Sequence, residues 1–194
     1  VQIVGSTEQK YDAKSSTSAT KTDTLLRDTP QSITVITKEL MRDQAMQSMS
    51  DAVTYVPGIV AGQGEGNRDA AIFRGNSSTA DFYVDGVRDD VQYYRDFYNI
   101  ERVEALKGSN AMIFGQGGSG GVINRVTKQP QWKSIHEVAL TVGSFSNRRI
   151  TADLGTAVDK NVAFRVTGLN ENSDSFRNGV YVKRSGINPG FAVR

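Results

Sequence analysis

Residues 99–130 read "NIERVEALKGSNAMIFGQGGSGGVINRVTKQP", and this stretch is compatible with two very different folds. Five of the seven residues from Gly115 to Gly121 are glycine. Such a turn can hold a phosphate when a helix begins directly after it, because the free N–H groups of the first helical turn point at the anion. It can also lead into a strand, since glycine adopts positive φ without strain. The residues that follow decide between these two interpretations.

The residues after the glycines favour a strand. They read "GVINRVTK", are rich in β-branched side chains and end at Pro130. A Walker A loop needs a Lys-Ser/Thr pair after its last glycine, and Gly115–Gly121 lacks that pair. A dinucleotide-binding loop has the spacing G-x-G-x-x-G and then a long helix, whereas Gly115–Gly120 has only the spacing. The sequence therefore predicts a tight turn before a strand, and a nucleotide-dependent enzyme remains only as an alternative.

Composition excludes several classes of function. The chain has 194 residues, a formal net charge of +2, no cysteine and one histidine, His136. Thiol catalysis, disulfide scaffolds and cysteine-based metal sites are excluded, and a lone histidine forms neither a metal cluster nor a nucleophilic triad. The balanced charge argues against nucleic-acid binding by bulk charge. No run approaches the roughly 18 apolar residues of a membrane-spanning helix. We expect no enzyme activity and no metal site.

The segment before residue 99 contains an arm, a strand and two helices. Residues 1–29 are polar apart from "VQIV" at the start, which predicts a flexible arm. "SITVIT" alternates apolar and polar residues as a strand does, and Thr37 is a suitable N-cap for a helix over "KELMRDQAM". A second helix is expected in "SMSDAVTYV", with Ser50 as its cap. Short strands and turns follow up to Val126, with Asp85, Asp89 and Asp90 expected as turn-forming residues.

The pattern changes after Pro130. "IHEVALTVGSF" places Val138, Leu140 and Val142 on one face of a strand, and similar strands of about ten residues recur up to the last residue. Their apolar side chains alternate with polar or small ones. This pattern is equally compatible with a soluble antiparallel sheet and with a transmembrane β-barrel, whose strands need about 9–11 residues to cross the bilayer.

The ordered set of motifs resembles a known family. "DTPQSITVIT", "SDAVTYVPGI", "IFRG", "YVDGVRDD" and residues 99–130 together are similar to the plug domain of TonB-dependent outer-membrane siderophore receptors, with the catecholate-type ferric siderophore receptors most alike. The resemblance implies an α+β plug domain, a small mixed sheet with short helices, followed by the first antiparallel strands of a transmembrane β-barrel of about 22 strands. The implied domains are an arm over 1–29, a plug over 30–130 and three to four barrel strands over 131–194. On this interpretation the chain is a fragment of the receptor.

The resemblance also implies a function. Such a receptor lies in the bacterial outer membrane with its N-terminal arm in the periplasm, binds a ferric siderophore and imports it through a barrel gated by the plug. Its expected partners are the C-terminal domain of TonB, the siderophore chelate and outer-membrane lipid, with no nucleic acid. No cofactor is expected, because the iron arrives inside its chelator. The alternatives are the same transporter with another cargo, such as cobalamin or an oligosaccharide, and a stand-alone soluble binding domain.

Three groups of site residues follow from the resemblance. The TonB contact would be Val1, Gln2, Ile3 and Val4, a short apolar segment able to pair with a strand of the partner. Arg74 and Arg102 would lock the plug by pairing with carboxylates of the barrel wall. The plug apices would contact the ligand through Asn67, Arg68, Asn76, Ser77, Gln92, Tyr93, Tyr94 and Arg95. Arginine charge and tyrosine rings suit an anionic chelate with flat aromatic arms.

Overall fold

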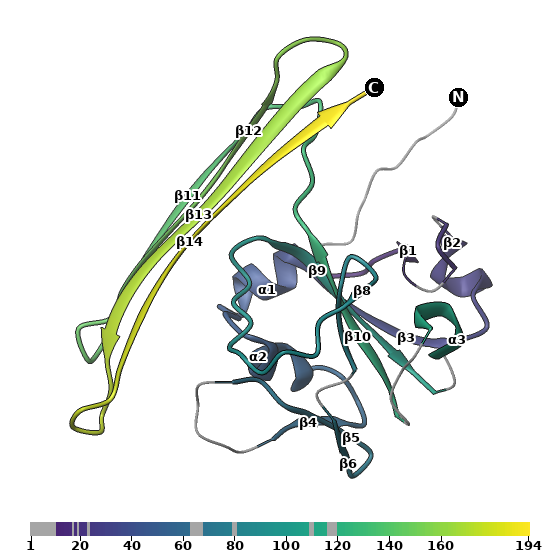
Figure 1. Ribbon diagram of the computed structural model, residues 1–194, viewed down its shortest axis with the longest axis horizontal. Helices are drawn as coiled ribbons and strands as arrows, with labels where there is room; N and C mark the ends of the chain where they lie inside the picture. The colour runs from purple at the N-terminus through teal and green to yellow at the C-terminus, as the bar shows by residue number, and fades with distance from the viewer. Residues whose placement is uncertain are drawn as a thin grey trace. The chain divides into compact units, whose positions relative to one another are not determined.

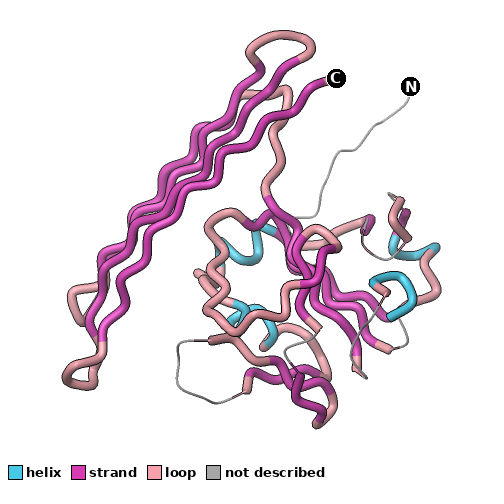
Figure 2. The backbone as a smooth tube through the Cα atoms, in the orientation of Figure 1, coloured by secondary structure: helices cyan, strands magenta, loops and turns pink. Residues whose placement is uncertain are grey.

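The computed structural model describes residues 11–194 except residues 17, 19, 23, 63–67, 79–80, 109–110 and 116–119. The chain divides into two compact units, Val1–Thr127 and Lys128–Arg194, named here the plug unit and the strand unit. Figures 1 and 2 show helices and short strands in the plug unit, and long strands alone in the strand unit. None of the helices in the described residues is long and apolar enough to cross a membrane.

The plug unit contains a mixed sheet with strand order β3-β9-β10-β7-β8 and two smaller sheets, β1-β2 and β4-β5-β6. Its described strands are β1 (Ser15–Ser16), β2 (Thr24–Leu25), β3 (Ser32–Thr37), β4 (Ile59–Ala61), β5 (Ala71–Phe73), β6 (Asn76–Ser78), β7 (Phe82–Val84), β8 (Val87–Arg88), β9 (Ile100–Lys107) and β10 (Gly121–Thr127). Its described helices are the 3-10 helix η1 (Leu26–Asp28), α1 (Lys38–Asp43), α2 (Met49–Val53) and α3 (Ala111–Phe114). Strands β7 and β10 pair in parallel and the other pairs are antiparallel, so the expected small mixed sheet with short helices is confirmed.

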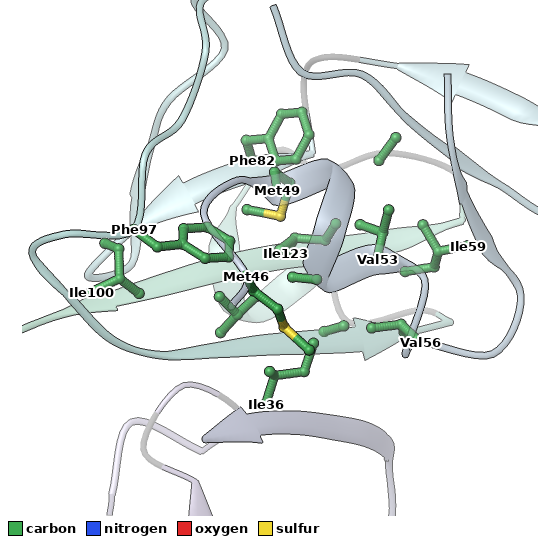
Figure 3. Packing of buried hydrophobic residues seen from close by; sticks show 14 of the residues in the cluster. Ile36, Met46, Met49, Val53, Val56, Ile59, Phe82, Phe97, Ile100 and Ile123 are labelled. Atoms are coloured by element: carbon green, nitrogen blue, oxygen red, sulfur yellow. The ribbon is translucent and has the colours of Figure 1, made fainter. Parts of the chain in front are cut away.

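The main core lies between this sheet and helices α1 and α2. Figure 3 shows Ile36, Phe82 and Ile123 of the sheet packed with methionine and aliphatic side chains of the helical segment. Burying such side chains is the dominant favourable contribution to folding. Strand β3 contributes to both faces of the sheet. Ile36 lies in this core and is 1% exposed, whereas Ile33, on the other face, packs against a smaller cluster.

Capping residues set where the two helices begin. The hydroxyl of Thr37 accepts a hydrogen bond from the backbone N–H of Leu40, which confirms Thr37 as the N-cap of α1. The expected cap of the second helix, Ser50, is wrong: Ser48 caps α2. The reason is a capping box, in which the Ser48 hydroxyl bonds the Asp51 N–H and the Asp51 carboxylate accepts from the Ser48 N–H.

The opposite face of the sheet carries a smaller cluster and two buried polar side chains. Tyr83, Leu106 and Val122 form the cluster, and the Tyr83 and Phe114 rings lie 4.6 Å apart. Glu104 and Asn124 occupy paired positions on β9 and β10, and both are buried. In Figure 1, β1, β2 and α3 lie on this side of the sheet, opposite α1 and α2.

The described part of the N-terminal arm is bonded to these polar residues. The Ser16 hydroxyl donates to the Glu104 carboxylate at 2.7 Å, and the Asn124 side-chain amide donates to the Ser18 hydroxyl at 2.6 Å. The prediction of a flexible arm over residues 1–29 therefore does not hold for the described residues of Tyr11–Thr29, which include β1, β2 and η1. A polar segment can be ordered in this way because buried polar groups are costly without hydrogen-bond partners.

The glycine-rich stretch ends in a strand, as predicted. Helix α3 ends at Phe114, and Gly115 follows it with φ +83°, a common way to end a helix. Gly120 lies against Phe73, where an added Cβ would be 2.4 Å from the Phe73 Cβ. Strand β10 then begins at Gly121. Positive φ accounts for Gly115, and close packing of the backbone against Phe73 and Leu106 accounts for Gly120 and Gly121.

The strand unit is an antiparallel sheet of β11 (Ile135–Val142), β12 (Arg148–Ala157), β13 (Val162–Asp174) and β14 (Tyr181–Val193) in sequential order. Val138, Leu140 and Val142 are exposed on one face, as their alternation predicts. Ion pairs occupy the other face: Arg165 donates to both carboxylate oxygens of Asp153 at 2.7 Å, and Arg149 pairs with Glu171 at 2.6 Å. This alternation matches the expected arrangement of antiparallel strands with one apolar and one polar face.

Candidate functional site

The loop between β8 and β9 contains four of the expected ligand-contacting residues, Gln92, Tyr93, Tyr94 and Arg95. Gln92 is exposed, Tyr93 is 38% exposed and Tyr94 is half-buried. Arg95 is 0% exposed, so the expectation that its guanidinium meets the ligand directly is wrong for this structure. Its charge is instead compensated inside the plug unit, because a buried guanidinium is costly unless it is paired and hydrogen-bonded.

The paired acid is Asp89, from the start of the same loop. Arg95 Nε lies 3.2 Å from Asp89 Oδ2, and Arg125 of β10 also donates to this carboxylate oxygen. The Tyr93 hydroxyl donates to the same atom at 2.7 Å. Burial lowers the pKa of Arg95, and the neighbouring Asp89 carboxylate opposes that shift. Asp89, expected from the sequence as a turn-forming residue, is therefore also the charge partner of Arg95.

A second loop is joined to the first at this point. The backbone N–H of Arg95 donates to Asp69, and the N–H of Asp69 donates to the Tyr93 carbonyl at 3.1 Å. Asp69 is 1% exposed, and burial raises the pKa of its carboxyl above the ordinary value. Next to it, Arg68 donates to the Gln92 side-chain oxygen. The structure thus brings Arg68 and Gln92 together, as the expected ligand surface requires, while Asn67 lies outside the described residues.

The third expected apex is a hairpin in the smaller sheet β4-β5-β6. Strands β5 and β6 pair through Phe73 and Asn76, with Arg74 and Gly75 between them. Both of these turn residues have positive φ, +47° and +88°, which is the geometry of a tight type I′ hairpin turn. Asn76 and Ser77 are exposed directly after the turn.

A cavity of about 280 Å³ adjoins the loop that carries the tyrosines. Its lining includes Tyr93, Tyr94, Tyr98 and Arg125. Three aromatic rings and one guanidinium line the same hollow. Burial raises the pKa of Tyr98, so its hydroxyl stays protonated at neutral pH. The three rings offer flat apolar surface beside the Arg125 guanidinium.

The two arginines expected to lock the plug differ in their surroundings. Arg74 is exposed at the hairpin turn. Arg102 on β9 donates to Glu104, and its side chain is 27% exposed. This contact means that a partner for Arg102 exists within the plug unit itself. The expected TonB contact, Val1 to Val4, lies outside the described residues.

Sequence reasoning missed the residues that organise these loops. Asp69, Asp89 and Arg125 form the buried polar cluster around Arg95, here called the Arg95 cluster. One signal pointed to Arg125, because it follows Ile123 at the two-residue period of a strand and so shares its face, where an unpaired charge is unfavourable. Asp69 is separated from Arg95 by 26 positions, and no local pattern indicates that they meet.

The fold and these loops agree with comparisons to known proteins. The family "TonB-dependent Receptor Plug Domain" matches residues 25–122, about half of the chain, and the chain belongs to this family. The family comprises receptors and not enzymes, in agreement with the sequence interpretation.

Individual relatives are receptors of the bacterial outer membrane. The chain is 36% identical over 169 residues to the probable TonB-dependent siderophore receptor PiuA of Acinetobacter baumannii, covering 84% of this chain and 23% of the relative. It is 33% identical to the catecholate siderophore receptor Fiu of Escherichia coli K12, covering 85% and 22%. The crystal structure of the closed form of Fiu superposes with a TM-score of 0.87 at 30% identity, covering 94% of this chain and 26% of Fiu. The chain thus spans about a quarter of the length of these relatives.

Proposed function

We propose that the chain is the plug and first wall strands of an outer-membrane receptor that binds a ferric siderophore and imports it with energy supplied through TonB. The strongest support is that two observations occur together. The fold is similar to that of Fiu over most of the chain, and hydrogen bonds join the two adjacent loops that carry Arg68, Gln92 and Tyr93. The iron remains in its chelator and needs no protein ligand.

Within this proposal the ligand surface comprises Arg68, Gln92, Tyr93 and Tyr94, with Asn67, Asn76 and Ser77 as additional contacts. A guanidinium and phenol rings suit an anionic complex with flat aromatic arms, because charge attraction and ring stacking act together. A catecholate chelate has both properties. This chemistry and the name of one relative, the catecholate siderophore receptor Fiu, favour a catecholate over a hydroxamate cargo.

The proposal is tested with the full-length receptor. Binding of iron(III) complexes of catechol and of acetohydroxamate is measured by the quenching of tryptophan fluorescence, and uptake is measured with radioactive iron in cells. We expect saturable binding of the catechol complex, and uptake that stops when the proton gradient is collapsed. Absence of binding to either complex, with an intact folded receptor, would contradict the siderophore function and favour another cargo.

Arg74 and Arg102 remain proposed plug locks. Pairs with wall carboxylates would hold the plug until energy is supplied, since removing one partner of a buried pair costs about 3–5 kcal/mol. We expect Arg74→Ala to make the full-length receptor leak, seen as greater single-channel conductance or antibiotic entry. Arg102→Ala should have a smaller effect because Glu104 already supplies a partner within the plug unit. If both variants show the same conductance and antibiotic entry as the parent, the proposed role of Arg74 and Arg102 in locking the plug is wrong.

A further inference from the structure

Arg95 uses every nitrogen of its guanidinium to hold the loop that carries it. Nε donates to the Asp89 carboxylate at 3.2 Å, and Nη1 donates to the Tyr93 carbonyl at 3.2 Å. Nη2 donates to two further carbonyls, those of Asp89 at 3.0 Å and Val91 at 2.6 Å. One buried side chain therefore bonds the backbone of the loop at three residues.

Two aromatic rings also contact this guanidinium. Its central carbon lies 4.1 Å from the ring centre of Phe82, which belongs to the main core, and 4.5 Å from that of Tyr93. Cation–π contacts are strongest where water is excluded, and Arg95 is 0% exposed. Through Arg95, these contacts connect Tyr93, a partly exposed residue of the proposed ligand surface, to Phe82 of strand β7.

The second loop is attached through the same residue. The backbone N–H of Arg95 bonds Asp69, and the next residue back, Arg68, bonds Gln92. Arg95 thus bonds groups next to each residue of this surface. It bonds Asp69, which follows Arg68, and the carbonyls of Val91 and Tyr93, which lie on either side of Gln92. The Arg95 side chain, itself inaccessible to the ligand, holds the first loop, and the second loop is bonded to the backbone of that held loop.

We propose that Arg95 is a positioning residue, which orders the two loops before the ligand arrives. The assignment of the ligand rests on the proposed function, whereas the ordering of the loops does not. Loops that are already ordered lose less conformational freedom on binding, so more of the contact energy appears as affinity. Lysine cannot replace arginine here, because an ammonium is a compact charge without the planar fork that reaches several acceptors and stacks on rings.

The test uses the full-length receptor with the iron(III)–catechol complex as probe, and it compares three variants. Arg95→Lys keeps the charge and removes the fork. Gln92→Ala removes a proposed contact and leaves the Arg95 cluster intact. Arg88→Lys is the matched control, since Arg88 is an exposed residue of the adjacent β8 that pairs with Asp90 at 3.3 Å. Affinity is measured by fluorescence titration, and loop order by hydrogen exchange of the backbone amides.

We expect Arg95→Lys to weaken binding about tenfold, the effect of one lost hydrogen bond to a charged group, and to speed exchange over residues 89–96. Exchange in β9 and β10 should not change. Gln92→Ala should weaken binding with normal exchange, and Arg88→Lys should change neither. Normal exchange over residues 89–96 in Arg95→Lys would overturn the proposal, as would faster exchange with unchanged affinity. Loss of protection throughout β9 and β10 would show a general core role and also overturn it.

A second variant protects the test against misfolding. Asp89→Asn keeps the fork, the three carbonyl bonds and both ring contacts of Arg95, but it removes the carboxylate that Arg95 and Arg125 share. We therefore expect faster exchange over residues 89–96 in this variant as well, because two guanidinium groups lose their countercharge. Normal exchange in both variants would contradict our proposal. If the parental receptor does not bind the probe, the proposed function fails, and the exchange measurements alone decide whether Arg95 orders the loops.

Discussion

At the scale of single residues, Gly121 limits what the plug unit tolerates at the start of β10. Its φ is +146°, and an added Cβ would lie 2.4 Å from the carbonyl oxygen of Leu106 in the neighbouring strand. We expect Gly121→Ala to lower the free energy of unfolding of residues 1–127 by more than about 2 kcal/mol, because backbone must move to relieve the overlap. Urea unfolding followed by circular dichroism measures this loss.

Gly108→Ala is the control for that experiment. Gly108 also has positive φ, +99°, but an added Cβ there would meet no atom within 4 Å. Only the cost of a left-handed backbone remains, about 1 kcal/mol. Equal losses for the two variants would show that φ, and not the contact with Leu106, limits this position.

Asp69 makes the stability of the plug unit depend on pH. Burial raises the pKa of its carboxyl in the folded state, so the folded chain holds this proton more tightly than the unfolded chain. The resulting stabilisation is complete below the unfolded pKa and is lost as pH rises through the folded pKa. We therefore expect the parent to gain stability relative to Asp69→Asn as pH falls from neutral towards the ordinary aspartate pKa of 3.8. Thermal unfolding of both proteins at several pH values measures the difference, and a pH-independent difference would contradict this assignment.

Among single residues, Arg95 shows most clearly what a residue's type and neighbours can and cannot indicate. Two adjacent tyrosines and an arginine in a polar loop suggest a ligand contact. The same residues in space form a buried cluster, because Asp89 and Asp69 reach the arginine from two directions. Solvent exposure depends on which loops pack together, and local composition does not contain that information.

At the scale of elements, the segment Ser15–Ser18 acts as part of the sheet's second face. Ser16 and Ser18 provide hydrogen-bond partners for Glu104 and Asn124, which are 0% and 2% exposed. We expect the double change Ser16→Ala and Ser18→Ala to destabilise the plug unit by about 1–3 kcal/mol in total, because one Glu104 oxygen and the Asn124 amide nitrogen lose their partners. Glu104 keeps its contact with Arg102, and the Asn124 oxygen keeps its bond to the Gly86 N–H. Hydrogen exchange of β9 and β10 should quicken in the same variant.

Ser15→Ala provides the comparison within β1, since Ser15 is less buried than Ser16. It should change the unfolding free energy by no more than about 0.5 kcal/mol. If the double variant and Ser15→Ala behave alike, residues 15–18 lie on the sheet without contributing to its stability, and the arm acts as the polar tail that its composition suggests.

Local signals predicted most of the elements. Alternation predicted β3 and the strands after Pro130, and Thr37 marked the start of α1, because periodicity and capping act within a few residues. The error at Ser50 is also local, since both Ser48 and Ser50 are good caps and only Ser48 has Asp51 three residues later. The pairing of β7 with β10 in parallel joins residues about 40 apart, and no short pattern specifies it.

At the scale of the whole molecule, residues 1–4 provide the test of energy coupling. We propose that Val1, Gln2, Ile3 and Val4 form the segment that pairs with TonB, since apolar β-prone residues suit strand addition. Deleting them from the full-length receptor should leave binding of the iron(III)–catechol complex unchanged and abolish uptake of radioactive iron. Deleting the polar residues 6–9 instead is a length-matched control and should reduce uptake less. Normal uptake without residues 1–4 would place the TonB contact elsewhere.

The sequence by itself determined the class of this protein. The order and spacing of its motifs specify the plug family, and the two-residue alternation after Pro130 specifies antiparallel strands, since both signals are carried along the chain. Only the tertiary structure decided which polar residues are buried. Arg95 and Glu104 became internal because Asp89, Asp69 and Ser16 meet them from other segments, and a buried charge or carboxylate is stable only where such partners converge. Convergence of segments separated by up to 88 positions is a property of the fold.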